Sequence, residues 1–416
     1  MRPSHFRSLR SPLRVVGACL AVLLLPWAPA AAAEPRPAAA EPVMNGAVFN
    51  DPAAGPASGT PTAAQRAVFD QLIGLIRATP ANERIEFAMF EFTDGASGVP
   101  QQVVDSLLAA HDRGVDVRII LDSTDKNDPV HERLDSALGH GDSAGSWVVQ
   151  CGTDRGCIGR NYSHEKFALF SRVVLANGAT HQDVVFQSSS NLTDWYLFNS
   201  YNEAFTLSDA TVYDGYRRHF ADLNAGRKRD VAPDYFWTTP TGSTYRAHFY
   251  PRAQGTGDPM VNVLRNVECS YQDEAGVARQ TDIRLVVSAF TQHRRAIAEE
   301  LIRLRGENCW IDVVYATNGI EPTVMSTLDN TAANGKTLQL TPCTHDVAAG
   351  HQVRPHAKVM MTDGHYDDDI VPRVYTGSAN FTHLENSDDS QLRIMGREVH
   401  DAYLSWFYDL RAACRA

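Results

Sequence analysis

A short cassette of residues occurs twice in this chain, and it constrains the fold more than any other feature. The first copy consists of the triplet 164–166 (His-Glu-Lys) and the later segment 188–193 (Ser-Ser-Ser-Asn-Leu-Thr). The second consists of the triplet 356–358 (His-Ala-Lys) and the segment 377–382 (Gly-Ser-Ala-Asn-Phe-Thr). One His-x-Lys triplet arises by chance in many chains. Two triplets, each followed by a small-residue turn that ends in Asn-x-Thr, indicate an internal duplication.

The patterns around the two cassettes repeat in the same order. Strand-like and helix-like periodicities alternate in each half. We expect a helix, a strand, a helix and a strand over 62–78, 84–92, 100–113 and 115–122, and again over 259–267, 283–290, 293–305 and 309–315. Such alternation predicts an α/β protein of two pseudo-symmetric halves, 46–240 and 241–416, with mixed or parallel sheets flanked by helices. The active site is expected at the interface of the halves.

The N-terminus has the pattern of an export signal. Four arginines precede an apolar run over 15–27, and small residues follow it over 28–33. This run is too short to span a bilayer comfortably, so we expect 1–33 to be a signal peptide and 34–45 a flexible leader. An uncleaved anchor is the alternative. The protein is therefore predicted to be secreted.

Cysteine usage agrees with export. Of the seven cysteines, Cys19 lies in the expected signal peptide, and the even number that remains predicts disulfides in an oxidising compartment. Cys151 and Cys157 are expected to pair locally, because the glycines between them let the short loop fold back. The pairing of the other four stays open: Cys269, Cys309, Cys343 and Cys414.

The charge of the chain weighs against a long nucleic-acid substrate. Its formal net charge is −11, and removal of the signal peptide takes away arginines but no acidic residue. Proteins that grip long nucleic acids usually carry a clustered basic face, and no long basic run occurs here. A small basic cleft in an acidic surface remains compatible with a nuclease.

The doubled motifs resemble the phospholipase D superfamily over essentially the whole mature chain. The family pattern H-x-K-x(4)-D with G-S-x-N is complete in the second copy, where Asp363 and Gly377 fill the last acidic and first glycine positions. The first copy has Ser171 and Ser188 at those positions. The resemblance implies that this aspartate supports the motif structurally and does not react.

The residue types also suit phosphodiester cleavage on chemical grounds. One imidazole can attack phosphorus and form a phospho-histidine, while the other protonates the leaving alcohol and then activates water. The phosphoryl oxygens need donors, and the candidates are Lys166, Lys358, Asn191, Asn380, Ser189 and Ser378. The residues alone do not rank the imidazoles. The resemblance implies that His164 is the nucleophile and His356 the acid and base.

Each imidazole also needs a partner that orients it through its second ring nitrogen. Glu203 and Asp388 are the candidate carboxylates, with Asp389 in reserve. Asp363 completes the expected outer shell of the site.

Two further groups of residues have alternative readings. Cys343, His345, His351 and His356 contain metal-ligand types, but their irregular gaps lack the spacing of a zinc site, so neither a metal nor another cofactor is expected. Trp195, Tyr196 and Phe198 follow the first turn. They fit an apolar mouth for acyl chains or part of the core, and both readings stay open.

These expectations together describe a secreted, monomeric phospholipase D that cleaves phospholipid headgroups and contacts a membrane surface transiently. The first alternative is a nuclease that uses the same site on DNA or RNA. The second is a binding module that has lost catalysis, although intact His-x-Lys triplets in both copies weigh against it. Headgroup preference and the balance between hydrolysis and transfer are not fixed by the sequence.

Overall fold

The computed structural model describes residues 41–142, 145–241 and 244–415. The expected signal peptide and residues 34–40 of the expected leader lie outside the described residues. The described chain belongs to one compact unit that begins at Ala39. None of its helices combines the length and hydropathy that crossing a membrane requires.

The first half of the chain builds a seven-stranded mixed sheet. Its strand order is β1 (Gly46–Phe49), β9 (Glu203–Ser208), β7 (Thr180–Ser188), β6 (Lys166–Val174), β2 (Arg84–Met89), β3 (Asp116–Leu121) and β4 (Trp147–Gln150). The pairs β2–β3 and β3–β4 are parallel, and the other pairs are antiparallel.

The second half builds an eight-stranded sheet. Its order is β10 (Trp237–Thr238), β11 (Tyr245–Phe249), β24 (Ser390–Met395), β22 (Arg373–Gly377), β20 (Val359–Asp363), β15 (Asp282–Val287), β16 (Trp310–Tyr315) and β17 (Gln339–Pro342). Apart from the edge strand β10, each strand has a counterpart in the first sheet with the same pairing direction. The predicted fold class, with two similar halves and mixed sheets, is confirmed.

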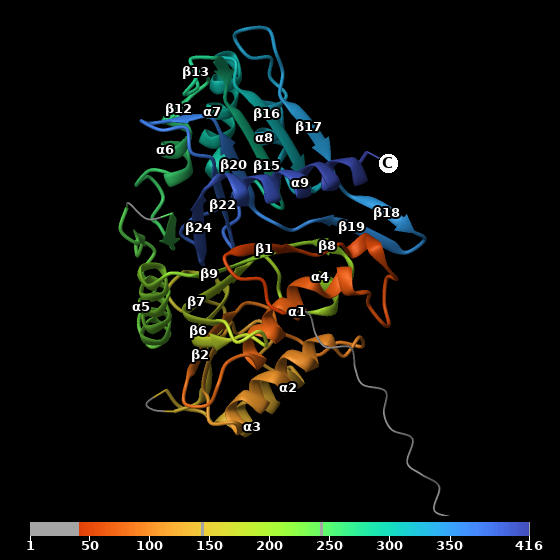
Figure 1. Cartoon of the computed structure of the whole chain (residues 1–416), viewed down its shortest axis with the longest axis vertical. Helices are drawn as coiled ribbons and strands as arrows, with labels where there is room; N and C mark the ends of the chain where they lie inside the picture. Colours follow the sequence, from red (N-terminus) through yellow and green to blue (C-terminus); the bar gives the residue numbers. More distant parts are fainter. Residues whose placement is uncertain (1–40, 143–144, 242–243, 416) are drawn as a thin grey trace, which may run out of the picture. The chain divides into compact units, whose positions relative to one another are not determined.

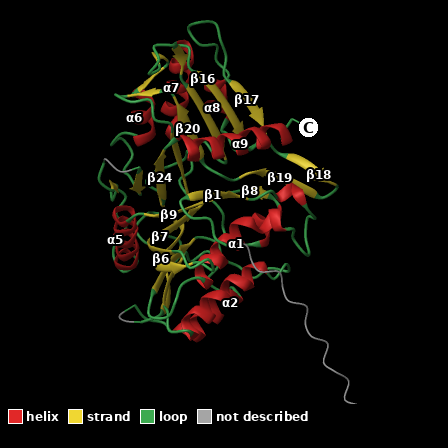
Figure 2. Cartoon of the chain, in the orientation of Figure 1, coloured by secondary structure: helices red, strands yellow, loops and turns green. Residues whose placement is uncertain are grey.

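The helices form three sets, each defined by the sheet faces that it covers (Figures 1 and 2). The first set packs with the first sheet and comprises α1 (Ala63–Arg77), α2 (Val99–Asp112) and α3 (Pro129–Leu138). The second packs with the second sheet and comprises α6 (Pro259–Arg265), α7 (Arg295–Gly306) and α8 (Pro322–Leu328). All four helices expected from the sequence are present. The short α4 (Asp194–Phe198) follows the first Asn-x-Thr turn.

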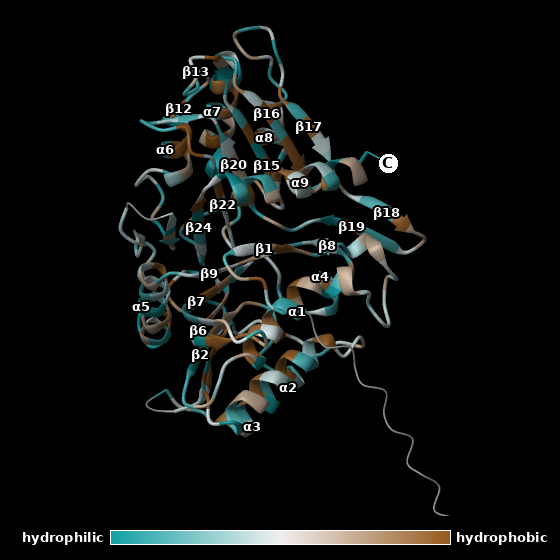
Figure 3. Ribbon diagram, viewed as in Figure 1, coloured by the Kyte–Doolittle hydropathy of each residue, from teal (hydrophilic) through white to brown (hydrophobic). Residues whose placement is uncertain are grey.

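The third set connects the halves. Helix α5 (Ala210–Gly226) contacts β7 of the first sheet and β11 of the second, and α9 (Arg397–Ala413) contacts β22 of the second sheet and β1 of the first. Their apolar side chains form a central core with residues of both sheets. Hydrophobic residues line the sheets and alternate with hydrophilic ones along the covering helix α2 (Figure 3), as burial of one helix face requires.

Short strands add a second set of connections. Strand β5 (Tyr162–Ser163) pairs in parallel with β23 (Ser387–Asp388), and β8 (Ser200–Tyr201) pairs in parallel with β19 (His351–Pro355). Each of these pairs joins a strand of one half to a strand of the other. The remaining short strands are β12 (Val267–Glu268) with β21 (His365–Tyr366), β13 (Ser270–Gln272) with β14 (Ala278–Gln280), and β18 (His345–Ala348) beside β19.

Three disulfides close loops in the described chain. Cys151–Cys157 is the predicted local pair. The structure assigns the pairs that the sequence left open, which are Cys269–Cys309 and Cys343–Cys414.

Asp388 supports the fold and does not orient an imidazole, contrary to the expectation from the sequence. Its carboxylate accepts hydrogen bonds from the backbone N–H groups of Cys157, Ile158 and Gly159, at 2.5 to 3.2 Å. The reason is its position in β23, where it lies beside Ser163 and faces the loop before the first cassette. A fully buried carboxylate in such a cradle fastens that loop to the second half.

We therefore expect Asp388→Asn to destabilise the protein. An amide offers one acceptor oxygen where the carboxylate offers two, so the free energy of unfolding should fall by about 2 kcal/mol. Chemical denaturation monitored by fluorescence measures this loss, with the exposed Asp230→Asn as the matched control. Unchanged stability combined with a severe loss of turnover would contradict this role.

Candidate active site

The two cassettes lie at corresponding ends of the two sheets. Each His-x-Lys triplet leads into a strand, β6 or β20, and each Ser-x-Asn segment follows its antiparallel neighbour, β7 or β22. An antiparallel pair places the start of one strand beside the end of the other. Each half therefore brings its own lysine and asparagine to one edge, and both lysines are buried.

His164 is oriented by a carboxylate of the other half. Its Nδ1 lies 2.8 Å from Oδ1 of Asp389. The parallel pair β5–β23 explains this contact, because His164 follows β5 and Asp389 follows β23. The rings of Phe90 and Tyr162 pack edge-on against the imidazole. Nε2 makes no hydrogen bond to the described residues, so it is the ring atom available to a substrate.

His356 is oriented by an amide of the other half. Its Nδ1 lies 3.0 Å from Oδ1 of Asn202, and the pair β8–β19 aligns these residues in the same way. The Asn202 Nδ2 group donates to the carbonyl and hydroxyl oxygens of Ser200, so Oδ1 is the atom that faces the ring. Nδ1 of His356 therefore carries the proton. Nζ of Lys358 lies near both ring nitrogens, 3.2 Å from Nδ1 and 3.0 Å from Nε2, so this contact by itself does not distinguish the tautomers.

The serines of the two turns hold these orienting residues in matching ways. Ser378 Oγ donates to Oδ1 of Asp389 at 2.7 Å, and Ser189 Oγ donates to Oδ1 of Asn202 at 3.1 Å. Each serine hydroxyl also accepts a backbone N–H from the residue after its partner, at 3.0 Å. Ser189 and Ser378, expected to bind substrate, thus fix the groups behind the imidazoles in this structure.

Glu203 and Asp363 also differ from their expected positions. The carboxylate of Glu203 accepts hydrogen bonds from the hydroxyls of Thr376 and Tyr403 and makes no hydrogen bond to His356. It faces the central core because side chains alternate along a strand, and Asn202 precedes it. Burial raises the pKa of Glu203 to about 7. Asp363, at the far end of β20, pairs with Arg397 of α9.

Burial is the main cause of the shifted pKa values in the site, and the neighbouring lysines add to it for both imidazoles. Burial and Lys166 lower the pKa of His164 to about 4, and Lys358 contributes from the other half. Burial, Lys358 and Lys166 hold the pKa of His356 well below its ordinary value. Burial also lowers the pKa of Lys166 to about 8. A bound anion would relieve this concentration of positive charge.

The two asparagines lie at the turns but differ in their contacts. Asn191 donates through Nδ2 to Oε2 of Glu91 at 2.9 Å, which leaves one amide hydrogen for a ligand. Asn380 is held by its backbone, whose carbonyl accepts from buried Arg294. The Oδ1 atoms of both asparagines have no hydrogen-bond partner among the described residues. Glu91 also opposes the lowered pKa of both cassette lysines.

The aromatic residues after the first turn separate into core and surface. Phe198 is buried in the core of the first half. The ring of Tyr196 packs at a tilt against that of His356, with the centroids 4.8 Å apart, and Trp195 is 37% exposed with the guanidinium of Arg354 over it. Trp195 and Tyr196 therefore line the approach to His356.

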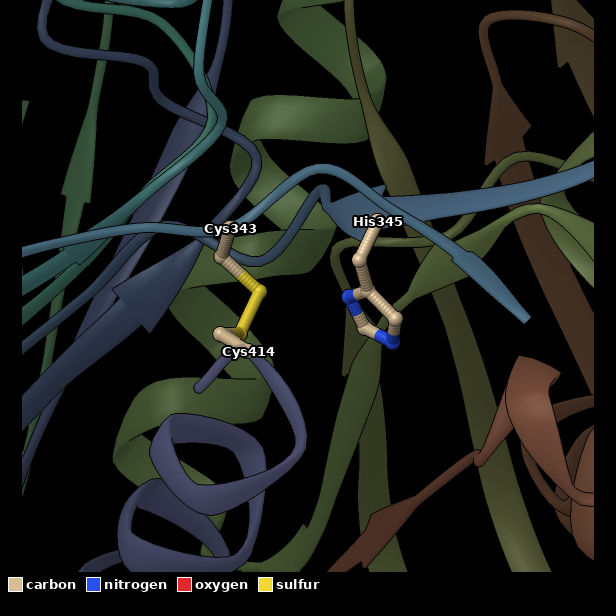
Figure 4. A group of neighbouring side chains, drawn as sticks. All are labelled: Cys343, His345 and Cys414. Carbon is tan, nitrogen blue, oxygen red and sulfur yellow. A yellow bond between two sulfur atoms is a disulfide. The ribbon is translucent and has the colours of Figure 1, made fainter. Parts of the chain in front are cut away.

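The cysteine and histidine group that suggested a metal does not assemble in the described structure. Cys343 and Cys414 are bonded to each other, with His345 beside them (Figure 4). Their sulfurs are not available as thiolates. Nε2 of His351 lies 2.8 Å from the backbone carbonyl oxygen of Phe198, and His356 belongs to the cassette site.

The sequence analysis missed Asn202 and Glu91 and ranked Asp389 behind Asp388. The interval from the turn serine is 13 positions to Asn202 and 11 positions to Asp389, so an ungapped alignment of the two halves does not pair these residues. Their equivalence is visible only in the structure, where each accepts from the serine of its own turn. Glu91 also has no signal in the sequence, because its contact with Asn191 depends on the tertiary fold.

Comparisons with known proteins give the family and the fold. Residues 74–224 match the family described as cardiolipin synthase, PLD-like domain. The chain also has the fold of phosphatidylserine synthase from Haemophilus influenzae Rd KW20, with a TM-score of 0.54, 10% identity, and coverage of 83% of this chain and 84% of that one. Polyphosphate kinase from Porphyromonas gingivalis gives a TM-score of 0.52 at 13% identity, covering 83% of this chain but 48% of the kinase.

Residues 74–224 thus carry a PLD-like domain, in agreement with the resemblance of the doubled motifs to the phospholipase D superfamily. A separate partial similarity, 30% identity over 115 residues, links it to N-formylglutamate deformylase from Pseudomonas aeruginosa. That alignment covers 28% of this chain and 36% of the deformylase. The family match includes the first cassette, with Asn202 and Glu203. The chain spans about a third of the length of the deformylase and about half of the length of the polyphosphate kinase.

Asn202 gives His356 a neutral partner, whereas Asp389 gives His164 a carboxylate, and the effect of this difference on the imidazoles can be tested. Asn202→Asp should raise the pKa of His356, because a carboxylate on Nδ1 stabilises the imidazolium. The limb of the pH profile of kcat/KM that reports His356 should move to higher pH by about one unit or more. A soluble phosphodiester is the suitable substrate, since it avoids effects of pH on lipid aggregates.

Asn199→Asp is the control for this measurement. Asn199 lies near Asn202 but donates to the carbonyl of Gln352 at the surface. A profile that moves equally in both variants would show a general effect of added charge and not a contact with His356.

Proposed function

We propose that this protein is a secreted phospholipase D that cleaves phospholipid headgroups through a phospho-histidine intermediate. One observation carries the proposal. Two His-x-Lys cassettes meet at one centre, where His164 and both lysines are buried and His356 is half-buried, and Asp389 and Asn202 each lie on Nδ1 of an imidazole from the opposite half. Such a centre offers two Nε2 atoms and two ammonium groups to a single phosphodiester. A binding module would need neither oriented imidazole.

In the first step His164 Nε2 attacks phosphorus, and the bond from phosphorus to the leaving alcohol oxygen breaks. Asp389 balances the positive charge that develops on the His164 ring. His356 protonates the leaving oxygen. Its pKa is low in the free protein, and the negative charge of a bound phosphodiester raises it, so the substrate itself favours the protonated acid.

In the second step water replaces the alcohol. His356 accepts a proton from water as the oxygen attacks phosphorus, and the bond from phosphorus to His164 Nε2 breaks. Lys166, Lys358 and the free amide hydrogens bind the phosphoryl oxygens in both steps. Neither step oxidises or reduces the substrate, and we propose that the reaction proceeds without a metal or other cofactor.

Several observations support a lipid over a nucleic-acid substrate. The chain is acidic overall, whereas long nucleic acids favour basic surfaces. Trp195 and Arg354 lie at the surface beside Tyr196 and His356. A tryptophan with a nearby cation suits the interface between lipid headgroups and acyl chains. The name of the phosphatidylserine synthase with the same fold also points to phospholipids. We propose a monomer that contacts membranes transiently.

Both imidazoles should be indispensable. We expect His164→Asn and His356→Asn each to reduce turnover of a soluble diester by at least about a thousandfold, because neither ring can perform the other's task. Circular dichroism and thermal unfolding check that the fold remains. His131→Asn, on α3, is the matched control. Substantial activity in either cassette variant would overturn the two-histidine mechanism.

The covalent step and the substrate can be tested in one assay. A short primary alcohol added to a phosphatidylcholine reaction should compete with water for the phospho-enzyme and yield the phosphatidyl alcohol. Configuration at phosphorus should be retained, because two in-line displacements each invert it. The assay is run with EDTA, so a requirement for a metal would appear as lost activity.

The outcomes distinguish the alternatives. Inversion at phosphorus without an alcohol adduct would contradict the covalent intermediate. Fast cleavage of DNA that falls steeply with salt, without lipid turnover, would support the nuclease and overturn the lipid substrate. No turnover of any diester would favour the binding module.

A further inference from the structure

Three arginines converge on one face of the second sheet, away from the cassettes. Arg246 of β11 lies directly opposite Arg393 of β24, and Arg373 lies on the next strand, β22; Figure 1 shows β22 and β24 in the second half. Like charges directly opposite each other in an antiparallel pair destabilise a sheet. Burial, together with Arg246 and Arg373, lowers the pKa of Arg393. Arg246 donates to the carbonyl of Thr239 and to the hydroxyl of Thr238, and these neutral partners leave its charge uncompensated.

Two buried side chains beside these arginines have polar atoms without partners. His248, next along the same face of β11, is 8% exposed, and neither of its ring nitrogens has a hydrogen-bond partner among the described residues. Arg373 is 4% exposed, and its Nε also has none there. Buried polar atoms are nearly always satisfied in folded proteins. Their lack of partners therefore points to a ligand.

The arginines and His248 line two hollows that meet. The larger has a volume of about 760 Å³ and is lined in part by Arg246, Arg373 and Arg393. The smaller, of about 270 Å³, is lined in part by His248. Arg246, Asn266 and Tyr366 belong to both. No cassette residue lines either hollow, so both are separate from the cassettes. Because they adjoin each other at three shared lining residues, we refer to the two together as the arginine-lined hollow.

Acidic residues around the larger hollow limit the size of the anion that can bind there. Asp369 also lines the larger hollow, and its carboxylate pairs with Arg373. Asp367 and Asp368 lie exposed on the adjoining turn at its rim. They would repel a long polyanion that extended beyond the hollow. A compact anion that stays between the guanidinium groups avoids this repulsion.

We propose that the arginine-lined hollow is a second binding site, specific for a phosphate group. Guanidinium groups bind phosphate oxygens through paired N–H donors, and a dianion offsets the repulsion between the arginines. His248 contributes a ring nitrogen to the same group. The phosphate belongs either to free inorganic phosphate or to a lipid with a phosphomonoester headgroup. The site is independent of the substrate proposed for the cassettes.

Calorimetry with inorganic phosphate tests the site. The cassettes also attract phosphate, so the wild-type protein should bind at two sites. Arg246→Gln and Arg393→Gln should each weaken one site at least tenfold and change turnover of a soluble diester less than twofold. Arg133→Gln, an exposed arginine of α3, is the control. Binding that is unchanged in both variants would overturn the proposal.

A measurement on the wild-type protein guards against variants that fail to fold. In histidine-labelled protein, the ring signals of His248 should move during a phosphate titration and saturate with the affinity of the site that the arginine variants weaken. Signals of His248 that stay fixed while those of His164 and His356 move would overturn the proposal.

Vesicles distinguish the two sources of phosphate. Co-sedimentation in the His164→Asn background, which should not convert phosphatidylcholine to phosphatidic acid, compares phosphatidylcholine vesicles with and without added phosphatidic acid and reports a lipid headgroup. Binding that needs phosphatidic acid and falls at least tenfold in Arg393→Gln would identify the lipid. Calorimetric binding of inorganic phosphate without such vesicle binding would identify free phosphate. Absence of both would refute the site.

Discussion

Two short parallel strand pairs determine whether this protein has an active site. His164 and Asp389 follow β5 and β23, and His356 and Asn202 follow β8 and β19. In each pair one strand comes from each half, so neither imidazole is oriented until the halves meet. The serines of the turns then hold the orienting residues from behind. Docking of the halves and assembly of the centre are therefore one event.

A buried polar network stabilises the same interface beneath the reacting groups. Glu165, between the histidine and lysine of the first cassette, accepts from Ser390 of the second half and lies 2.7 Å from Nε2 of His219 on α5. Nδ1 of His219 in turn lies 3.1 Å from the hydroxyl oxygen of Tyr235. Glu165 and His219 are fully buried, and removing either partner would leave the other unsatisfied. This network resists sliding of the halves, which would separate the imidazoles from their partners.

The duplication is nearly symmetric in backbone and asymmetric in charge. The equivalent positions behind the imidazoles hold a carboxylate in one copy and an amide in the other, Asp389 and Asn202. A carboxylate favours the charged ring, whereas an amide fixes a tautomer without favouring the cation. The two rings are thus prepared for different tasks by one functional group. We propose on this ground that His164 is the nucleophile and His356 the acid and base.

The sequence by itself determined the duplication, the α/β layers and the elements that carry the cassettes, because hydrophobic periodicity and local motifs are written in neighbouring residues. It also identified the local disulfide Cys151–Cys157. Only the tertiary structure decided which residues stand behind the imidazoles. Asp388 and Asp389 are neighbours in the sequence but have different partners, as do Asn202 and Glu203, so a register shift of one residue would exchange their roles. That register is set by pairing between the halves, which no local pattern encodes.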